Sequence, residues 1–213
     1  MANDLAEVLL AVQTDLRDTG EAIWSDAEIT EHIRHALRVY SQLNPQRLSK
    51  SVACTATREY SIATAVAADL IDITDVWYPY ESGDPAHPPE RPGWEILGGG
   101  ILYLHSDDLP TADDHLRVFY TAPHTLKDLD AATATTLEVA GKQAVQLLAQ
   151  AFAAQSYAAS AINTVTASGW TPRHLQEWAD ARLKQAEAEL ARIVEREIRK
   201  QDTRTHWELL DYK

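Results

Sequence analysis

The sequence predicts a mainly α fold: a helical bundle of about four helices with a small antiparallel β insertion. Three observations predict it. Apolar residues recur at helical spacing at both ends of the chain, the middle third changes to short β-branched and aromatic runs, and 213 residues leave room for a bundle carrying an insertion. The predicted parts are a helix pair (1–48), an acidic β-rich insertion (49–127), long helices (128–200) and a docking tail (201–213).

The N-terminal pair begins with a short amphipathic helix over residues 5–16, followed by the acidic loop 15–18. A second helix starts after Ser25, and Glu28 stands three positions later, which completes a Ser-x-x-Glu capping box. Its apolar stripe consists of Ile29, Ile33, Ala36, Leu37 and Tyr40. Pro45 ends the helix, because the residue before a proline disfavours the helical conformation.

The middle of the chain predicts strands. Four short segments are rich in β-branched and aromatic residues and partly alternate: 51–57, 70–78, 101–105 and 116–121. Between the second and third lies a proline-rich stretch, 82–92, which predicts a surface loop. Cys54 falls in the first strand and is expected to be a small buried apolar residue.

Helical spacing returns towards the C-terminus. Thr135 and Glu138 repeat the capping-box pattern at the start of an alanine-rich helix over 136–162, whose small residues let a neighbouring helix approach closely. Thr171 as N-cap and Pro172 at the first helical position then open a longer helix that is expected to end near residue 199. We expect these two helices to pack together and to share surface with adjacent subunits.

Charge and composition exclude several classes of protein. Acidic residues number 32 and basic residues 19, a net charge of -13, and residues 46–130 alone hold 14 acidic against 6 basic side chains. Specific nucleic-acid binding needs a basic surface, so it is not expected. No apolar run is long enough to span a membrane, the N-terminus lacks the basic region of a secretory signal, and one cysteine excludes an internal disulfide. We therefore expect a protein made in a cytoplasm.

One helix face carries the residue types of a metal site. Glu28, His32 and His35 stand at i, i+4 and i+7, so a carboxylate and two imidazoles share a face. No other ligand is placed by the sequence to complete a site. The favoured interpretation is a solvated polar face.

Other short motifs also fail to predict chemistry. The acidic pairs at 107–108 and 113–114 offer oxygen ligands for Ca²⁺ but lack the spacing of a calcium loop. The glycine run 98–100 is not followed by the Lys-Ser/Thr of a phosphate-binding loop. The sequence thus predicts no enzyme, no cofactor and no metal.

The order of motifs resembles the tailed-phage head-to-tail adaptor (connector, or head completion) proteins of the virion neck. The N-terminal likeness is a short helix, the acidic loop, Trp24-Ser25-Asp26, and a long helix ending near Asn44-Pro45. A second likeness is the strand 116–120 followed by a Pro-His-x-Leu turn at 123–126, which leads back into helices. Each motif is short, and their order is more specific than any one of them.

This resemblance implies a structural virion protein. The family forms a ring, commonly of twelve subunits, that docks under the portal protein, extends the DNA channel and provides a platform for the downstream neck or tail protein. DNA would pass without specific binding, no membrane would be involved, and the location would be the virion neck. The alternatives are another phage structural or assembly factor, such as a tail completion or head-closure factor, and an unrelated helical binding module or an enzyme with a site the sequence does not display.

The resemblance also assigns contact residues. In phage adaptors the C-terminal segment reaches the portal, so it implies portal docking through the apolar side chains of the tail: Trp207, Leu209, Leu210 and Tyr212. Two tryptophans near the proline-rich loop, Trp77 and Trp94, are either the edge of the core or a partner contact.

Overall fold

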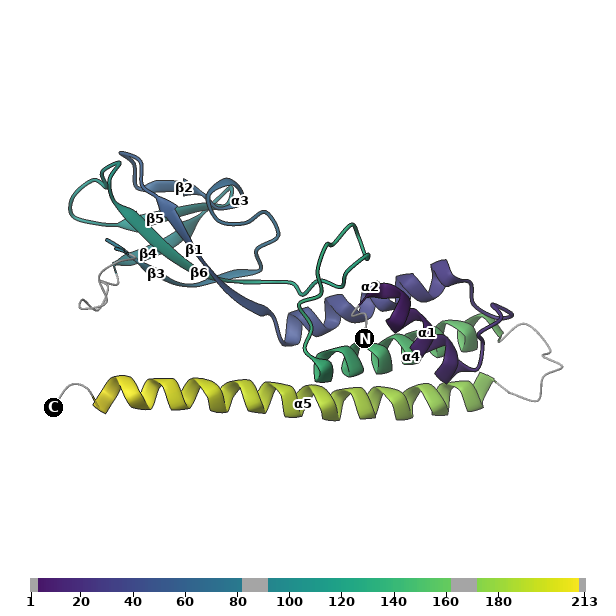
Figure 1. Ribbon diagram of the computed structural model, residues 1–213. Helices are drawn as coiled ribbons and strands as arrows, with labels where there is room; N and C mark the ends of the chain where they lie inside the picture. The colour runs from purple at the N-terminus through teal and green to yellow at the C-terminus, as the bar shows by residue number, and fades with distance from the viewer. Residues whose placement is uncertain (1–3, 82–91, 162–171, 211–213) are drawn as a thin grey trace. The chain divides into compact units, whose positions relative to one another are not determined.

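The computed structural model describes residues 4–81, 92–161 and 172–210, without the side chains of 161 and 200–210. The chain divides into two compact units, which we call the helical unit (Met1–Asn44 and His124–Lys213) and the β unit (Pro45–Pro123). Figure 1 shows that both ends of the chain contribute helices to the helical unit, whereas the β unit is one continuous segment.

The prediction of a mainly α fold is wrong. The protein is a mixed α/β structure, 48% helical and 21% in two three-stranded antiparallel sheets. The sequence pattern underestimated the β part because two of its strands carry weak signals. Glu59–Ser61 is only three residues long, and Gly93–Leu97 begins with a glycine directly after a proline.

The helical unit contains α1 (Leu5–Leu16), α2 (Asp26–Leu43), α4 (Val139–Ala161) and α5 (Pro172–Leu210). The capping box of α2 is confirmed: the Glu28 amide donates to Ser25 Oγ, and the Ser25 amide donates to the Glu28 carboxylate at 2.8 Å. All five residues of the predicted α2 stripe are buried. Both ends of α2 can therefore be predicted from the residues that lie next to them in the sequence.

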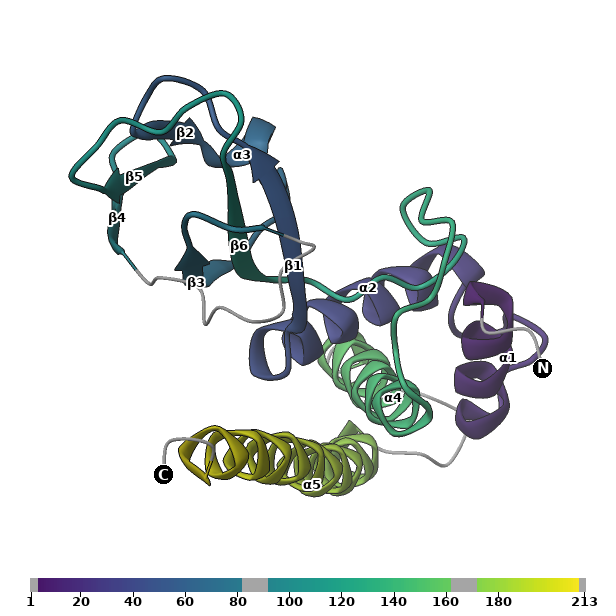
Figure 2. The same cartoon turned by 60° about the vertical axis from the view of Figure 1, so that its left-hand side comes forward.

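Helix α4 lies at the centre of the helical unit. Figure 2 shows α1, α2 and α5 arranged around it, and all three pack against it. Its buried surface is mostly alanine, which permits close contact: Ala144, Ala149, Ala151, Ala153, Ala154 and Ala158. Gly141 is needed for the same reason, since a Cβ there would stand 2.4 Å from Tyr40 Oη.

Two predicted helix ends are wrong. Helix α4 begins at Val139, and the Thr135 hydroxyl accepts from the Lys127 amide at 2.9 Å instead of capping the helix. Helix α5 does not end near residue 199 but continues to Leu210, so the predicted tail is largely its last turns. Thr171 lies outside the described residues. No described helix is long and apolar enough to cross a membrane.

The β unit holds two sheets, with strand orders β1-β6-β3 and β2-β5-β4. Its elements follow in chain order: β1 (Gln46–Ala53), β2 (Glu59–Ser61), α3 (Ile62–Ala65), β3 (Asp72–Trp77), β4 (Gly93–Leu97), β5 (Ile101–His105) and β6 (His115–Ala122). Residues from both sheets form one hydrophobic core, including Val76, Leu102 and Val118. Cys54 is buried in this core, as predicted.

Candidate functional site

Two of the three residues singled out for metal binding have other structural roles. The Glu28 carboxylate serves the α2 cap, and the hydrogen bond from the Ser25 amide holds the pKa of Glu28 below its usual range. The His35 ring packs against Phe152 at a centroid distance of 4.6 Å. Among the described residues, no group of three or more His, Cys, Asp or Glu side chains is placed to hold a metal ion.

The acidic turn around Asp114 is also structural. Its carboxylate accepts from the Thr111 amide at 2.8 Å and from the Tyr78 hydroxyl at 3.0 Å. These bonds fix the turn that leads into β6. A carboxylate that already has such donors is a poor candidate for a cation ligand.

The residues predicted to dock on the portal lie at the end of α5 and beyond it. The α5 backbone carries Trp207, Leu209 and Leu210 as helix, but their side chains lie outside the described residues, as does all of Tyr212. Their assignment as portal contacts stays a prediction.

The two tryptophans of the β unit occupy different positions. Trp77 lies on β3, donates from Nε1 to Asp75 Oδ2 at 2.8 Å and packs against Phe119 with centroids 4.5 Å apart. Trp94 lies on β4 and is half-buried against the core. Trp94 thus packs against the core, while Trp77 belongs to an aromatic cluster on the other face of the β1-β6-β3 sheet, and a partner contact at either residue stays a prediction.

Arg117 extends this aromatic cluster. It pairs with Ser51 and Trp77 in register and donates to Tyr80 Oη at 2.5 Å and to Ser49 Oγ at 2.7 Å. Its guanidinium lies over the Tyr80 ring, 5.0 Å from the centroid. A cavity of about 260 Å³ adjoins it, which Asp113 and Glu81 also line. This mixture of charges favours no single ligand.

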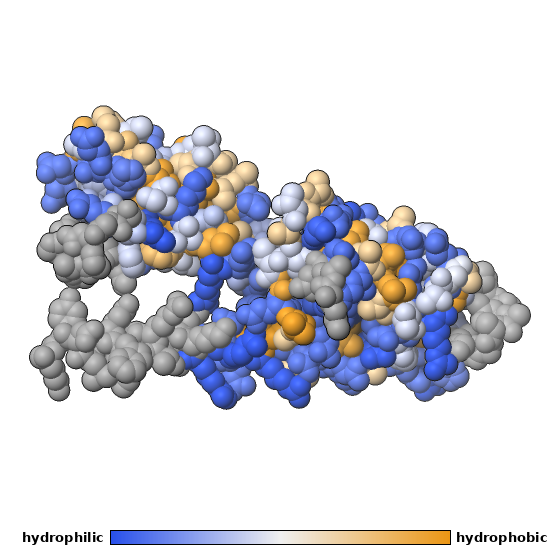
Figure 3. Space-filling view, viewed as in Figure 1, coloured by the Kyte–Doolittle hydropathy of each residue, from blue (hydrophilic) through white to orange (hydrophobic). Residues whose placement is uncertain are grey.

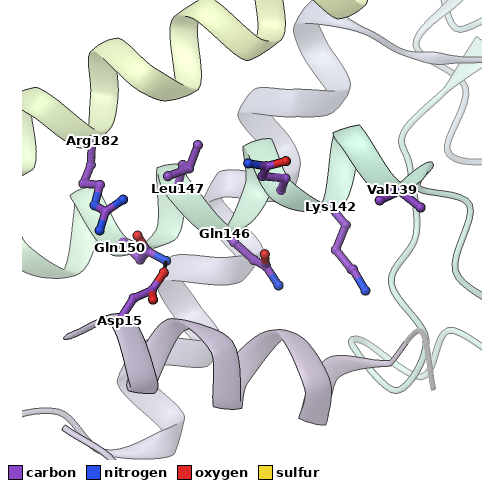
Figure 4. Close-up of a pocket in the computed structure, with 8 residues that line it drawn as sticks. Asp15, Val139, Lys142, Gln146, Leu147, Gln150 and Arg182 are labelled. Carbon is purple, nitrogen blue, oxygen red and sulfur yellow. Dashed lines mark hydrogen bonds between the residues drawn. The ribbon is translucent and has the colours of Figure 1, made fainter. Parts of the chain in front are cut away.

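A larger cavity opens in the helical unit. It has a volume of about 360 Å³ and lies among α1, α4 and α5. Figure 4 shows Gln150 between Asp15 of α1 and Arg182 of α5, while Lys142 and Gln146 point towards α1. We call this the α4 groove.

Polar groups in the α4 groove and beside it are only partly satisfied. Gln150 is 1% exposed and donates from Nε2 to Asp15 Oδ2 at 2.6 Å, but its Oε1 is buried without a hydrogen-bond partner among the described residues. The Lys142 ammonium contacts Glu7 Oε1 at 2.8 Å, and Glu7 Oε2 is likewise buried and unsatisfied. Arg182 stacks on Trp178, 5.0 Å from the ring centroid. Both unsatisfied oxygens are buried, so neither is open to a ligand in the groove, whose charged lining residues are Asp15, Lys142 and Arg182.

Sequence reasoning missed the α4 groove. The available signal was the spacing of Gln143, Gln146 and Gln150 in an otherwise small and apolar helix. Positions i, i+3 and i+7 share one face of a helix, so this face differs from the alanine-rich one. The groove holds no pair of nucleophile and base, and its polarity suits binding.

The loop between α1 and α2 is fixed by one buried carboxylate. Asp18 accepts from the backbone amides of Ala22, Ile23 and Trp24 at 2.8, 3.0 and 2.8 Å. Burial raises its pKa, but the three amide donors outweigh burial and leave the pKa below its usual range. This arrangement places Trp24 where its Nε1 donates to the Ala153 carbonyl on α4 at 3.3 Å.

Comparison with known proteins gave structural likenesses alone. No protein-family model and no curated protein matches the chain. One similar chain comes from the neck of a native GTA particle computed with C12 symmetry: it is 16% identical, with 84% of this chain and 92% of that chain covered. Another comes from the virion of a native gene transfer agent (GTA) particle, at 17% identity with 81% and 86% covered. Both have a TM-score of 0.30, which does not establish a shared fold.

Proposed function

We propose that this protein is a structural subunit of a virion neck, an adaptor ring that docks under the portal, extends the DNA channel and carries the next neck or tail protein. The motif order of the sequence supports the class of protein. The structural observation that carries the proposal is the length of α5. In a ring, neighbouring chains would cover the turns of α5 that extend past α4.

Helix α5 is longer than α4, and the extra length lies at its C-terminal end. Helix α5 has 39 residues and α4 has 23, so at 1.5 Å per residue they measure about 58 and 35 Å. Arg196 of α5 forms an ion pair with Glu138, the residue before α4 begins. The last turns of α5 therefore extend about 20 Å beyond the start of α4, as the yellow end of the helix in Figure 1 shows.

The surface of the helical unit supports an assembled state. Large apolar side chains are exposed on its helices and loops, among them Leu10, Ile23, Leu43, Val139 and Ile198. Figure 3 shows hydrophobic residues among hydrophilic ones at this surface. A ring buries such residues between neighbours. The net charge of -13 suits a channel through which DNA slides, and the proposal includes no catalytic activity, cofactor or specific DNA binding.

The test is to measure the mass of the purified chain by light scattering, alone and after mixing with the portal ring of the same virus. We expect a ring that co-migrates with the portal. Deleting residues 203–213 should leave a helical protein that no longer joins the portal, because this deletion removes the last turns of α5. A chain that remains monomeric and ignores the portal, or a truncated chain that still joins it, would contradict this assignment.

A further inference from the structure

The chain passes between the helical unit and the β unit twice, and each connection is a single proline. Only Pro45 separates Asn44, the last residue of the first helical segment, from β1, and only Pro123 separates β6 from His124. A proline has no backbone N–H, so neither connection can be held by a hydrogen bond donated from its own main chain. The residues that hold Asn44 and His124 therefore fix the base of both connections.

One polar cluster holds these two residues. The His124 amide donates to Ser41 Oγ of α2 at 2.9 Å, and Asn44 Nδ2 donates to Tyr40 Oη at 2.9 Å. The rings of Tyr40 and His124 meet edge to face, with centroids 5.2 Å apart. We call these four residues together with Thr136 the His124 clasp. All five belong to the helical unit.

The surroundings of the His124 ring suit its neutral form. Nδ1 lies 3.1 Å from Thr136 Oγ1, which also accepts from the Thr125 amide at 2.9 Å. Nε2 is buried and has no hydrogen-bond partner among the described residues. A neutral ring can donate from Nδ1 and leave only an unused acceptor at Nε2. An imidazolium would instead leave a charged N–H buried there, which costs more than an unused neutral acceptor.

The charged groups around the clasp do not compensate for this cost. Tyr40 faces the ring from α2, and Glu138 stands before the start of α4, where Arg196 of α5 already pairs with it. Burial lowers the pKa of His124, and nearby main-chain groups and the Glu138 carboxylate oppose burial without reversing it.

We propose that the His124 clasp is a proton-operated release, closed while the ring is neutral and opened when acid protonates it. Opening would free the base of both connections at once. The folded-state pKa of His124 lies below its unfolded value, so the contribution of the closed clasp is fully present above the unfolded pKa and falls as pH drops towards the folded pKa. The clasp lies within one chain, so this inference does not depend on the proposed ring.

The test is amide hydrogen exchange of the unchanged full chain, followed by NMR between about pH 7.5 and about pH 5 and corrected for the intrinsic effect of pH. The amides of His124 and Thr125 report on the clasp, because they donate to Ser41 and Thr136. We expect their protection to fall between about threefold and about thirtyfold. The upper limit applies to a ring that stays neutral while the clasp is closed and titrates near pH 6.5 when it is open. Amides in the middle of α4 should change less.

A variant separates the ring from other titrating groups. His124→Gln keeps a side-chain N–H that can donate to Thr136 but cannot be protonated in this range, so protection of the clasp should no longer depend on pH. The matched controls are His115→Gln on β6, which is exposed, and His32→Gln on α2, where burial also lowers the histidine pKa. Both controls should keep the pH dependence at the clasp amides.

The ring signals of His124 in the unchanged protein give a second readout that needs no variant. They should titrate below the ordinary histidine value near pH 6.5. Titration at or above that value would overturn the inference even where His124→Gln does not fold. Clasp protection that is independent of pH in the unchanged protein, or that stays dependent on pH in folded His124→Gln, would overturn it as well.

Discussion

The helical unit and the β unit are held together over very different distances along the chain. In the helical unit, hydrogen bonds join partners 129 and 135 residues apart: Trp24 to Ala153 and Gln150 to Asp15. In the β unit, strand pairing lies within the continuous segment Pro45–Pro123. The contacts of the helical unit therefore join segments on both sides of the β unit, whereas the strand pairs of the β unit join residues of one continuous segment.

The two cores also differ in the size of their residues. Helix α4 contributes alanines and Gly141, so its neighbours approach closely and a side chain at Gly141 would clash with Tyr40. The β unit fills its core with Val, Leu, Ile and Tyr from both sheets. Because each unit has its own core, the two units should lose stability independently when a buried residue is removed.

The largest expected effect comes from Trp24→Ala. Trp24 is 6% exposed, packs against Tyr157 with ring centroids 5.4 Å apart and bonds to Ala153. Its loss should cost the helical unit about 3–5 kcal/mol of unfolding free energy. Hydrogen exchange followed by mass spectrometry should show faster exchange in α1, α2 and α4, with β6 unchanged.

The matched variant is Leu116→Ala in β6, a residue that is 1% exposed in the core of the β unit. It should cost about 2–5 kcal/mol and speed exchange in the β unit alone. If either substitution speeds exchange equally in both units, the units form one cooperative structure and the comparison is wrong.

The sequence could predict the features that depend on residues close together in the chain. The N-cap of α2 depends on Ser25 and Glu28, three residues apart, and the α1 boundaries at Leu5 and Leu16 match the predicted ones. The end of α5 was missed because Arg199 and Lys200, which suit a helix end, do not stop a helix without a following proline or glycine. Thr135 was assigned to a cap because local spacing does not show that the Lys127 amide is its partner.

The β unit and the groove needed information that the spacing of residues does not contain. Strand β2 is three residues long, and its pairing with β5 is visible only in three dimensions. The α4 groove arises because Asp15, Gln150 and Arg182 come from three helices. Their positions follow from helix packing, so no motif in the sequence groups these three residues.

A middle-sized effect should follow from Asp18→Asn. Asp18 is 4% exposed, and an amide in its place turns one acceptor into a donor that faces backbone N–H groups. We expect a loss of about 1–3 kcal/mol, confined to the helical unit, in urea unfolding at neutral pH.

The effect of Asp18→Asn should depend on pH in a defined direction. The folded-state pKa of Asp18 lies below its unfolded value, so the carboxylate stabilises the fold fully above the unfolded pKa, and this contribution is lost as pH falls through the folded pKa. The difference between the two proteins should therefore shrink below about pH 4. The exposed Asp180→Asn on α5 is the control and should show neither effect. A constant difference across this range would mean that charge at Asp18 is not the cause.

The smallest effect is expected for Arg34→Gln. This variant tests whether an exposed ion pair between segments on either side of the β unit contributes to stability. Arg34 donates from Nε to both oxygens of Asp130 at 2.9 and 3.0 Å, across 96 residues of sequence, and the hydrogen bond from Arg34 holds the pKa of Asp130 below its usual range. Asp130 is nevertheless 61% exposed, so solvent and salt screen the pair. We expect a loss below about 1 kcal/mol in the helical unit, which added salt should reduce further. A salt-independent loss as large as that of Trp24→Ala would show that charged surface links, and not the buried residues of α4 and its neighbours, hold the two ends of the chain together.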